Sequence, residues 1–178
     1  MSILKIARMG HPVLRAKTRR LDRREIRMPA IQALVDDMIV TMGEYGGIGL
    51  AAPQVHRDLR LFVAALEMSA AQSDAGQVLV LFNPEVTVVG DEVAEDWEGC
   101  LSIPAICGLV PRPREITIAA LDRDGNRVEL RARDFVARVI QHECDHLDGV
   151  LYIDRMRSPQ SLAYEDQRRP STPPFLSY

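Results

Sequence analysis

The sequence predicts one α+β domain in which mostly antiparallel strands pack around a C-terminal helix. Three observations lead to this fold class. Residues 29–42 repeat apolar side chains every three or four positions, as an amphipathic helix does. Residues 59–133 contain runs of valine, leucine, isoleucine and phenylalanine separated by turn sequences, which is typical of strands. Residues 134–148 return to helical periodicity.

Composition and charge bound the possible functions. At 178 residues and 47% hydrophobic content, the chain suits one globular domain with a sizeable core. A net charge of -3 gives no general nucleic-acid footprint, so no direct DNA binding is expected. No apolar run has transmembrane length, and residues 1–12 lack the features of a secretory signal. Three cysteines fit a reducing compartment, so we expect a cytoplasmic protein without membrane contact.

The N-terminal part carries a turn, a basic run and the first helix. Residues 10–12 (GHP) predict a turn, and the cations of residues 15–27 are interpreted as a solvated face or an approach loop. Pro29 is well placed as the first helical residue, and Gly43 with residues 46–47 would end the helix. The apolar stripe of this helix, expected to face the core, is Ile31, Leu34, Val35, Met38, Ile39 and Met42.

The middle of the chain is expected to form strands. They are predicted at residues 59–66, 78–82, 85–89, 115–121 and 128–133. Residues 69–77 predict a polar hairpin loop, and residues 122–126 predict a turn within a second hairpin. A last helix is expected between Asp134, a plausible N-cap, and Gly149, which would stop it.

The C-terminal end differs in composition. Four prolines and little apolar periodicity follow residue 158, and a long stable helix cannot continue past Pro170. We therefore expect one domain over residues 1–157 and an extended or partly disordered Pro-rich tail over residues 158–178.

The last predicted helix carries a possible metal site. Phe135, Val139, His142 and His146 lie at steps of four, three and four, so they form one stripe that ends in two imidazoles. Two imidazoles one turn apart can chelate a divalent ion, and Glu143 could act there as a base without being a ligand. A helix that merely carries two histidines is the alternative, but the apolar stripe beneath them favours the metal site.

A catalytic site of this kind needs a third protein ligand. Cys100 is the best candidate, because a thiolate is a strong soft ligand and Gly99 lets the backbone approach the metal closely. His11 and His56 lie in segments that predict a turn and a charged loop. Cys144 is two residues from each helical histidine, so its side chain should point away from the metal.

Residues 46–54 (GGIGLAAPQ) form a third unusual stretch. They are too rich in glycine for a helix interior and too apolar for a solvated loop. They predict a buried loop that brings backbone groups close to a ligand, with Gln54 as its polar end. No Gly-Lys-Ser/Thr follows, which argues against a phosphate-binding loop.

These stretches carry a specific resemblance. Residues 47–54 (GIGLAAPQ), 98–102 (EGCLS) and 141–146 (QHECDH) resemble the three motifs of the peptide deformylase family, in the same order and at similar spacing. The resemblance covers about residues 1–157. It implies a metal-dependent amidohydrolase that removes the formyl group from the N-terminal formyl-methionine of newly made polypeptides and releases formate.

The resemblance also assigns roles. Its metal ligands map onto Cys100, His142 and His146. Glu143 would be the general base, and the Gln54 side chain with the backbone N–H of Leu101 would stabilise the oxyanion. The peptide would bind as an added strand. The residues expected to bind the peptide and its methionine side chain are Ile48, Gly49, Gly99, Phe135 and Val139.

The expected cofactor is one divalent ion. The resemblance favours Fe(II) in the cell, and Cys and His ligands would also accept zinc, nickel or cobalt in preparations. The expected partners are N-formyl-Met nascent peptides and the ribosome near its exit tunnel.

Two positions depart from the family pattern. Gly46 and Cys107 stand where many family members have an acidic and a basic residue, so an ion pair would be lost without leaving a stranded charge. Two alternatives stay open: a His-Glu-x-x-His metallopeptidase, and a non-catalytic deformylase-like protein that binds peptides or ribosomes.

Overall fold

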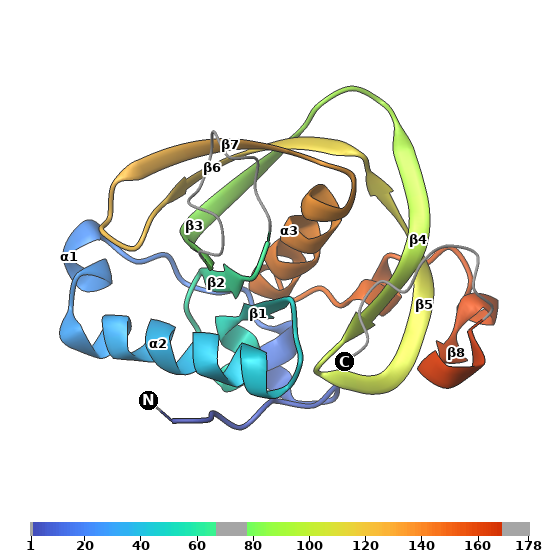
Figure 1. Ribbon diagram of the computed structural model, residues 1–178, viewed down its shortest axis with the longest axis horizontal. Helices are drawn as coiled ribbons and strands as arrows, with labels where there is room; N and C mark the ends of the chain where they lie inside the picture. The colour runs from blue at the N-terminus through green and yellow to red at the C-terminus, as the bar shows by residue number, and fades with distance from the viewer. Residues whose placement is uncertain (1, 67–77, 169–178) are drawn as a thin grey trace.

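The computed structural model describes residues 2–66 and 78–168 and confirms the α+β fold class (Figure 1). Its α-helices are α1 (Arg23–Ile26), α2 (Pro29–Glu44) and α3 (Asp134–Leu147). Its strands are β1 (Gly49–Ala51), β2 (Leu61–Ala64), β3 (Leu79–Val88), β4 (Val93–Cys100), β5 (Ile103–Pro113), β6 (Glu115–Leu121), β7 (Arg127–Arg133) and β8 (Ala163–Tyr164). The predicted loop at residues 69–77 and the tail beyond residue 168 lie outside the described residues.

The strands form two antiparallel sheets with α3 between them (Figure 1). The larger sheet has the order β1-β2-β3-β6-β7 and the smaller one the order β4-β5-β8. In both sheets every pairing is antiparallel, and short turns join β4 to β5 and β6 to β7. The strands β1 and β4 each pair on one side only, so each presents an edge.

Helix α3 uses different faces for the two sheets. Ala137, Ile140, Cys144 and Leu147 recur at three and four positions and are buried in an apolar cluster with strands of the larger sheet. The face that carries Arg138 turns the other way, and the Nη1 atom of Arg138 donates to the carbonyl of Val110 in β5. The helix is therefore held on one side by apolar packing and on the other by polar contacts.

Helix α2 closes the other end of the larger sheet. Its residues Leu34, Val35, Met38 and Met42 are buried against side chains of β1 and β2 such as Leu50. This confirms that the stripe predicted at residues 29–42 faces the core. Gly43 belongs to the helix, and the chain leaves it at Tyr45.

Two strands predicted separately form one strand. Residues 79–88 are the single strand β3, with a register shift between Phe82 and Glu85. Asn83 adopts a left-handed conformation at φ 53°, and its side-chain amide bonds the backbone of Leu21. The predicted break was therefore a bulge, which a side-chain amide stabilises.

The sequence did not predict β4 and β5. Strand β5 contains prolines at its second, ninth and eleventh positions, and β4 is rich in charged residues, so neither matched a strand pattern. The two strands nevertheless pair along most of their length. Their long hairpin carries Cys100 at its turn.

Both ends of α3 also differ in detail from expectation. Asp134 is not the N-cap, which is Arg133, and the Asp134 carboxylate instead accepts a hydrogen bond from Arg114. Gly149 follows the helix with φ 74°, as a stop residue should. Beyond it, β8 pairs with β5 inside the segment predicted as a tail. No helix in residues 2–66 or 78–168 is long and apolar enough to cross a membrane.

The geometry at Gly149 predicts the effect of a substitution. A Cβ atom there would lie 2.7 Å from the carbonyl oxygen of Arg15, and φ is positive, so Gly149→Ala should destabilise the fold by about 1–3 kcal/mol. Gly43→Ala is the matched control, because Gly43 is helical and an added Cβ meets nothing within 4 Å, so it should stabilise by up to about 1 kcal/mol. Urea denaturation of both variants tests this. Equal stabilities for both would contradict the role of Gly149.

Candidate metal centre

The long β4–β5 hairpin presents Cys100 at its tip. The register between these strands shifts between Gly99 and Cys100, and Cys100 pairs with Ile103 across a tight turn. The cysteine side chain is thereby buried and turned toward α3.

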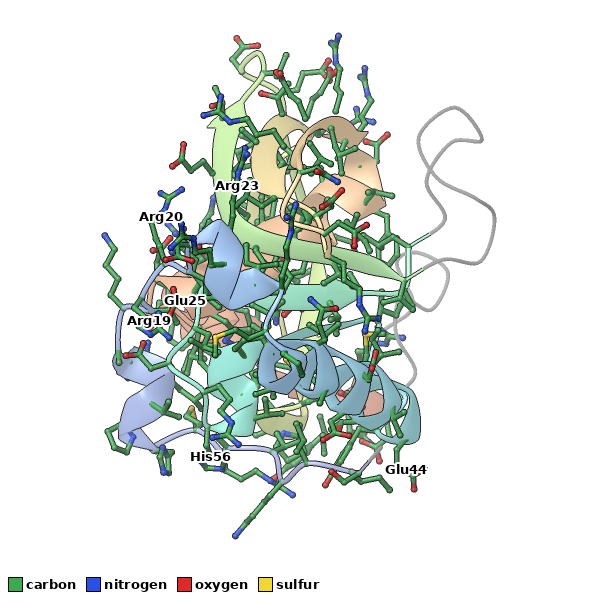
Figure 2. All side chains as sticks on the ribbon, turned by 90° about the vertical axis from the view of Figure 1, so that its left-hand side faces the viewer. Arg19, Arg20, Arg23, Glu25, Glu44 and His56 are labelled. Carbon is green, nitrogen blue, oxygen red and sulfur yellow. The ribbon has the colours of Figure 1, made fainter. Side chains whose placement is uncertain are left out.

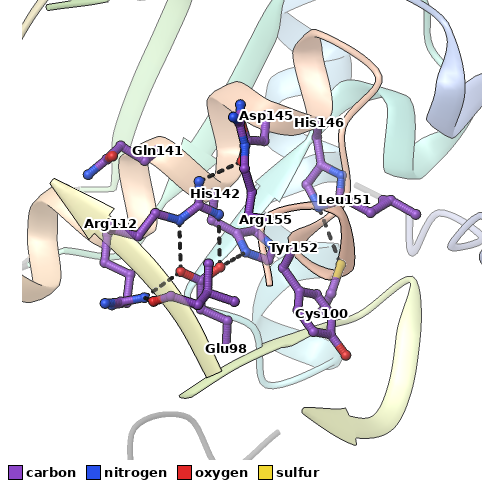
Figure 3. Close-up of polar contacts among 12 residues, drawn as sticks. Glu98, Cys100, Arg112, Gln141, His142, Asp145, His146, Leu151, Tyr152 and Arg155 are labelled. Atoms are coloured by element: carbon purple, nitrogen blue, oxygen red, sulfur yellow. Dashed lines mark hydrogen bonds and ion pairs between the residues drawn. The ribbon is translucent and has the colours of Figure 1, made fainter. Parts of the chain in front are cut away.

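The three predicted ligands converge. The ligand atoms of Cys100, His142 and His146 all lie within 4.8 Å of one another, and the Cys100 Sγ atom is 3.3 Å from His146 Nε2 (Figure 3). The two imidazole rings stand 78° apart with centroids separated by 5.0 Å, so their edges can meet at one point. Cys144 instead packs in the apolar cluster beneath the larger sheet, and burial raises the pKa of its thiol.

The donor set fits a divalent transition metal. One sulfur and two imidazole nitrogens are the ligands that zinc and ferrous iron accept, and they leave a position for substrate or water. A second observation supports the fit. The Glu143 Oε2 atom is buried and, among the described residues, has no hydrogen-bond partner. A buried carboxylate oxygen without a partner is costly unless a ligand or water meets it.

Glu98 orients the first histidine. Its Oε2 atom lies 2.9 Å from His142 Nδ1 (Figure 3). With the proton on Nδ1, this N–H donates a hydrogen bond to the carboxylate. The lone pair on Nε2 then faces Cys100 and His146. Such carboxylate–histidine pairs set the tautomer and the orientation of metal-binding imidazoles.

Two arginines hold Glu98 in turn. Arg112 donates from Nε and Nη2 to the two Glu98 oxygens, both at 2.9 Å, and Arg138 Nη1 donates to Oε1 at 2.7 Å. All three side chains are buried. Burial raises the pKa of Glu98, but the bonds from His142 and Arg112 outweigh it, and this pKa falls well below its usual range. Glu98 is therefore an anion inside the protein.

The network continues to the surface. Arg112 Nη1 also donates to Asp145, and Arg155 donates to the two Asp145 oxygens at 3.1 and 2.7 Å (Figure 3). The Arg155 side chain is half exposed. A chain of alternating charges thus joins the metal centre to solvent through β4, β5, α3 and the segment after α3.

The pKa values of the two histidines are shifted in opposite directions in the metal-free protein. Burial lowers the pKa of His142, but hydrogen bonds to Cys100 and Glu98 outweigh it and raise this pKa well above its usual value. Burial lowers the pKa of His146 well below its usual value, and the charge on His142 adds to the effect. Any proton on the His142 nitrogen that faces Cys100 and His146 must leave when a metal binds there.

Glu143 depends on a glycine for its position. The side chain is 3% exposed, and burial raises its pKa to about 7. A Cβ atom at Gly49 would lie 2.2 Å from Glu143 Oε1, so any larger residue there would displace this carboxylate. The glycine-rich loop therefore leaves the space that the predicted base occupies.

Gln54 lies beside Cys100. Its Nε2 atom is 3.5 Å from Cys100 Sγ and 3.3 Å from Ser102 Oγ, and its Oε1 atom accepts from the Ala51 N–H at 2.8 Å. The amide is thus oriented with its NH₂ group toward the cluster. Leu101 lies in the turn directly after Cys100 and close to Gly47. A Cβ atom added at Gly47 would be 3.0 Å from the Leu101 side chain.

The five predicted substrate-binding residues surround one hollow beside the cluster. Ile48 and Gly49 come from the end of the glycine-rich loop, Gly99 from β4, and Phe135 and Val139 from α3. Trp97, Glu98 and Arg138 also line it, together with His142 and Glu143. The wall is therefore less apolar than expected, although the Arg138 guanidinium is occupied by Glu98 and by the Ala94 and Val110 carbonyls.

Cys107, one of the two positions that depart from the family pattern, lies in a strand. It is buried in β5 opposite Ala163 of β8, and its Sγ atom lies 3.6 Å from the Ala163 carbonyl oxygen. Burial raises the pKa of its thiol. With Gly46 equally uncharged, the departure from the family pattern leaves no buried charge, and β8 covers this position.

Sequence reasoning missed the charged network. Glu98 and Asp145 stand out in the sequence only as members of motifs, and Arg112, Arg138 and Arg155 belong to no motif. The available signal was weak, namely single charges within otherwise apolar strand and helix segments. Partners 14 to 44 residues apart in sequence cannot be paired by periodicity.

Three protein ligands with a carboxylate beside them are typical of a catalytic rather than a structural metal centre, so the fold and the site define a metallohydrolase. Comparison with known proteins makes this specific. The family model for polypeptide deformylase matches residues 3–161, and the chain belongs to that family.

Individual relatives agree over nearly the whole chain. Peptide deformylase 2 of Nostoc sp. is 41% identical, covering 93% of this chain and 92% of the relative. Peptide deformylase 1 of Bordetella pertussis is 42% identical, covering 95% of this chain and 96% of the relative. A solved structure of the Acinetobacter baumannii class I type b enzyme with Met-Ala-Ser bound superposes with a TM-score of 0.80 at 33% identity, covering 88% of this chain and 100% of that one.

The Glu98–His142 contact predicts weaker metal binding when it is removed. Glu98→Gln should lower metal affinity about 10- to 100-fold, because the imidazole loses a charged partner that orients it and raises its basicity. Chelator competition measures this without any catalytic assay. Glu95→Gln is the control, since Glu95 lies on the same strand, is 41% exposed and has its ion-pair partner, Arg157, at 3.9 Å. Equal affinities of the two variants, each shown by its melting curve to be folded, would contradict the role of Glu98.

The pKa of Glu143 predicts a pH-dependent stability in the metal-free protein. The pKa of Glu143 is near 4.5 in the unfolded chain and about 7 in the folded protein. A carboxyl group with a pKa raised in this way increasingly destabilises the fold as pH rises from 4.5 through about 7. Glu143→Gln removes this penalty. The variant should match the wild type below pH 4.5 and exceed it above pH 7 by on the order of 3 kcal/mol. Denaturant titrations across this range test it, and a stability difference that does not vary with pH would refute it.

Proposed function

We propose that this protein is a metal-dependent amidohydrolase that removes the formyl group from the N-terminal formyl-methionine of newly synthesised polypeptides and releases formate. One observation supports this most directly. The Cys100, His142 and His146 cluster lies beside a buried glutamate whose Oε2 atom has no hydrogen-bond partner in residues 2–66 and 78–168, in a chain of the polypeptide deformylase family.

Cys100, His142 and His146 would hold the ion. When bound, a divalent metal supplies a Lewis acid that polarises a carbonyl oxygen and acidifies water. A thiolate and two neutral imidazoles leave a net charge of about +1 on such an ion. The protein itself must then position the amide, move the proton and stabilise the charge that develops on oxygen.

Glu143 is suited to move the proton. It is buried, its pKa is raised to about 7 by that burial, and Gly49 leaves it room. A base with a pKa near the working pH can accept a proton from the attacking water and then deliver it to the leaving amine. The Gln54 NH₂ group and the backbone N–H of Leu101 are the donors for the developing oxyanion, and both adjoin Cys100.

The peptide can bind between two strand edges. Strand β1 and strand β4 each pair on one side only, and the hollow beside the metal cluster is lined by residues of both. An extended peptide between them could add backbone hydrogen bonds on each side. Its methionine side chain would enter the hollow bounded by Ile48, Phe135 and Val139. The Acinetobacter baumannii relative was solved with a Met-Ala-Ser peptide, which supports this substrate class.

Fe(II) is the proposed ion in the cell, as the resemblance to the family implies. Zinc, nickel or cobalt is proposed in preparations, because the Cys and His ligands accept these metals as well. The proposed compartment is the cytoplasm. Nascent polypeptides are the proposed partners, met at the ribosome near its exit tunnel.

The two alternatives are less well supported. A metallopeptidase of the His-Glu-x-x-His type would take a downstream His or Glu as its third ligand, whereas Cys100 completes the cluster here. A non-catalytic peptide-binding protein would have no use for a buried glutamate of raised pKa next to that cluster.

Formate release from a short formyl-Met peptide tests the function. The assay compares wild type with Glu143→Ala under anaerobic conditions, with the metal content of each determined. The wild type should release formate, and the metal-replete variant should lose several orders of magnitude in kcat, because both proton acceptor and water-orienting group are gone.

Two outcomes would overturn parts of the proposal. Absence of formate release by metal-replete wild type would favour the peptide-binding alternative. Stoichiometric zinc in the most active anaerobic fraction would exclude Fe(II) as the working ion.

A further inference from the structure

Charge is distributed unevenly along this chain. Residues 1–27 contain nine lysines and arginines and two acidic residues, a net charge of +7, whereas the other 151 residues carry -10. The overall charge of -3 conceals this division. Charge asymmetry of this size points to a polyanionic partner for the basic part.

In the structure, residues 15–27 lie together on one side of the molecule, where Figure 2 shows Arg19, Arg20 and Arg23. Some of these cations have acidic partners: Arg19 pairs with Glu25 at 2.9 Å. Lys17, Arg23 and Arg24 are exposed and make no ion pair within the described part of the chain. The excess charge of this segment is therefore presented to solvent.

A hollow of about 680 Å³ adjoins this segment. Three arginines line it: Arg20, which pairs with Glu85 in the same hollow, Arg23 in α1 and Arg127 at the start of β7. Arg127 is exposed and, like Arg23, has no ion-pair partner among residues 2–66 and 78–168. Guanidinium groups bind phosphate oxygens in a bidentate manner, which makes such a cluster suited to phosphodiesters.

The backbone beneath these arginines is fixed. Asp22 caps α1 in a reciprocal capping box with Glu25. The Asn83 amide accepts from the Leu21 N–H at 3.0 Å and donates to its carbonyl at 2.7 Å, tying residues 15–27 to β3. The backbone therefore needs little ordering on binding, which removes one part of the entropic cost of association.

The surroundings favour an extended polyanion over a small anion. Glu85 and Glu129 also line the hollow, so a single phosphate there would meet charges of both signs. A nucleic-acid backbone could contact the three arginines and also Lys17 and Arg24 outside the hollow. A membrane fits less well, because Met28 is the one large exposed hydrophobic residue of the described chain that adjoins residues 15–27 in sequence.

We propose that the basic face, formed by residues 15–27 and Arg127, binds the phosphate backbone of RNA without reading its sequence. The choice of RNA among polyanions rests on the proposed function, because nascent polypeptides emerge from an RNA-rich particle. Arg15, at one end of this face, pairs with Asp154 after α3, but the part of the face at α1 lies away from the β4–β5 hairpin that carries Cys100 (Figure 1). RNA bound there leaves the peptide site accessible.

The test measures fluorescence anisotropy of a short labelled RNA duplex with the metal-loaded full chain at several salt concentrations. Wild-type affinity should fall steeply as salt rises, since phosphate contacts release counterions. Arg23→Glu with Arg127→Glu should weaken binding at least about tenfold at low salt and flatten the salt dependence. Neither residue touches the metal cluster, so formate release from a free formyl-Met peptide should not change.

Arg114→Glu with Arg157→Glu is the matched control. It changes the net charge by the same amount at two ion-paired arginines outside the basic face, the half-buried Arg114 and the exposed Arg157. This variant should bind RNA within about threefold of wild type at moderate salt, because exposed charges beyond a Debye length are screened.

Three outcomes would overturn the proposal: no salt-dependent RNA binding by wild type, an equal loss in both double variants, or tighter binding to phosphatidylserine vesicles than to RNA. Because the anisotropy assay uses no substrate, its failure is separate from any failure of formate release. Melting curves of both variants establish that they are folded.

Discussion

The buried carboxylate of Glu98 is the contact on which the site depends. It lies between Arg112, Arg138 and His142, which come from β5 and α3, and so it joins the smaller sheet to the helix that carries two of the ligands. Burying a carboxylate is costly, and removing one partner of a buried ion pair leaves the other charge uncompensated. Three donors to one carboxylate make this arrangement tolerable. They also give His142 a fixed ring orientation, which apolar packing alone would not provide.

Helix α3 therefore has two kinds of neighbour. Its apolar face packs on the larger sheet, where side chains such as Ile140 tolerate small adjustments. Its charged face binds the smaller sheet through hydrogen bonds with directional requirements. The metal ligands lie where the two faces meet, so the position of the histidines is set by the polar side and supported by the apolar side.

The glycine-rich loop and the basic face are distant segments with different proposed roles. Gly49 brings β1 close enough to Glu143 that a side chain larger than hydrogen would displace the carboxylate. Cys107, where the family pattern predicts a charge, is covered by β8 instead. Lys5 and Arg8 line a hollow that also includes Cys100, whereas the arginines of α1 lie at the α1 end of the molecule, where the RNA contact is proposed.

The sequence by itself determined the fold class, the helix periodicities and the family, because helical spacing and three ordered motifs are local signals. It also predicted which residues would gather at the site, and the structure brings Cys100, His142 and His146 within reach of one another. Only the tertiary structure decided the β4–β5 hairpin, the bulge at Asn83 and the ion-pair network around Glu98. These depend on pairing between segments far apart in sequence, and neither residue type nor periodicity specifies which partner a buried charge will meet.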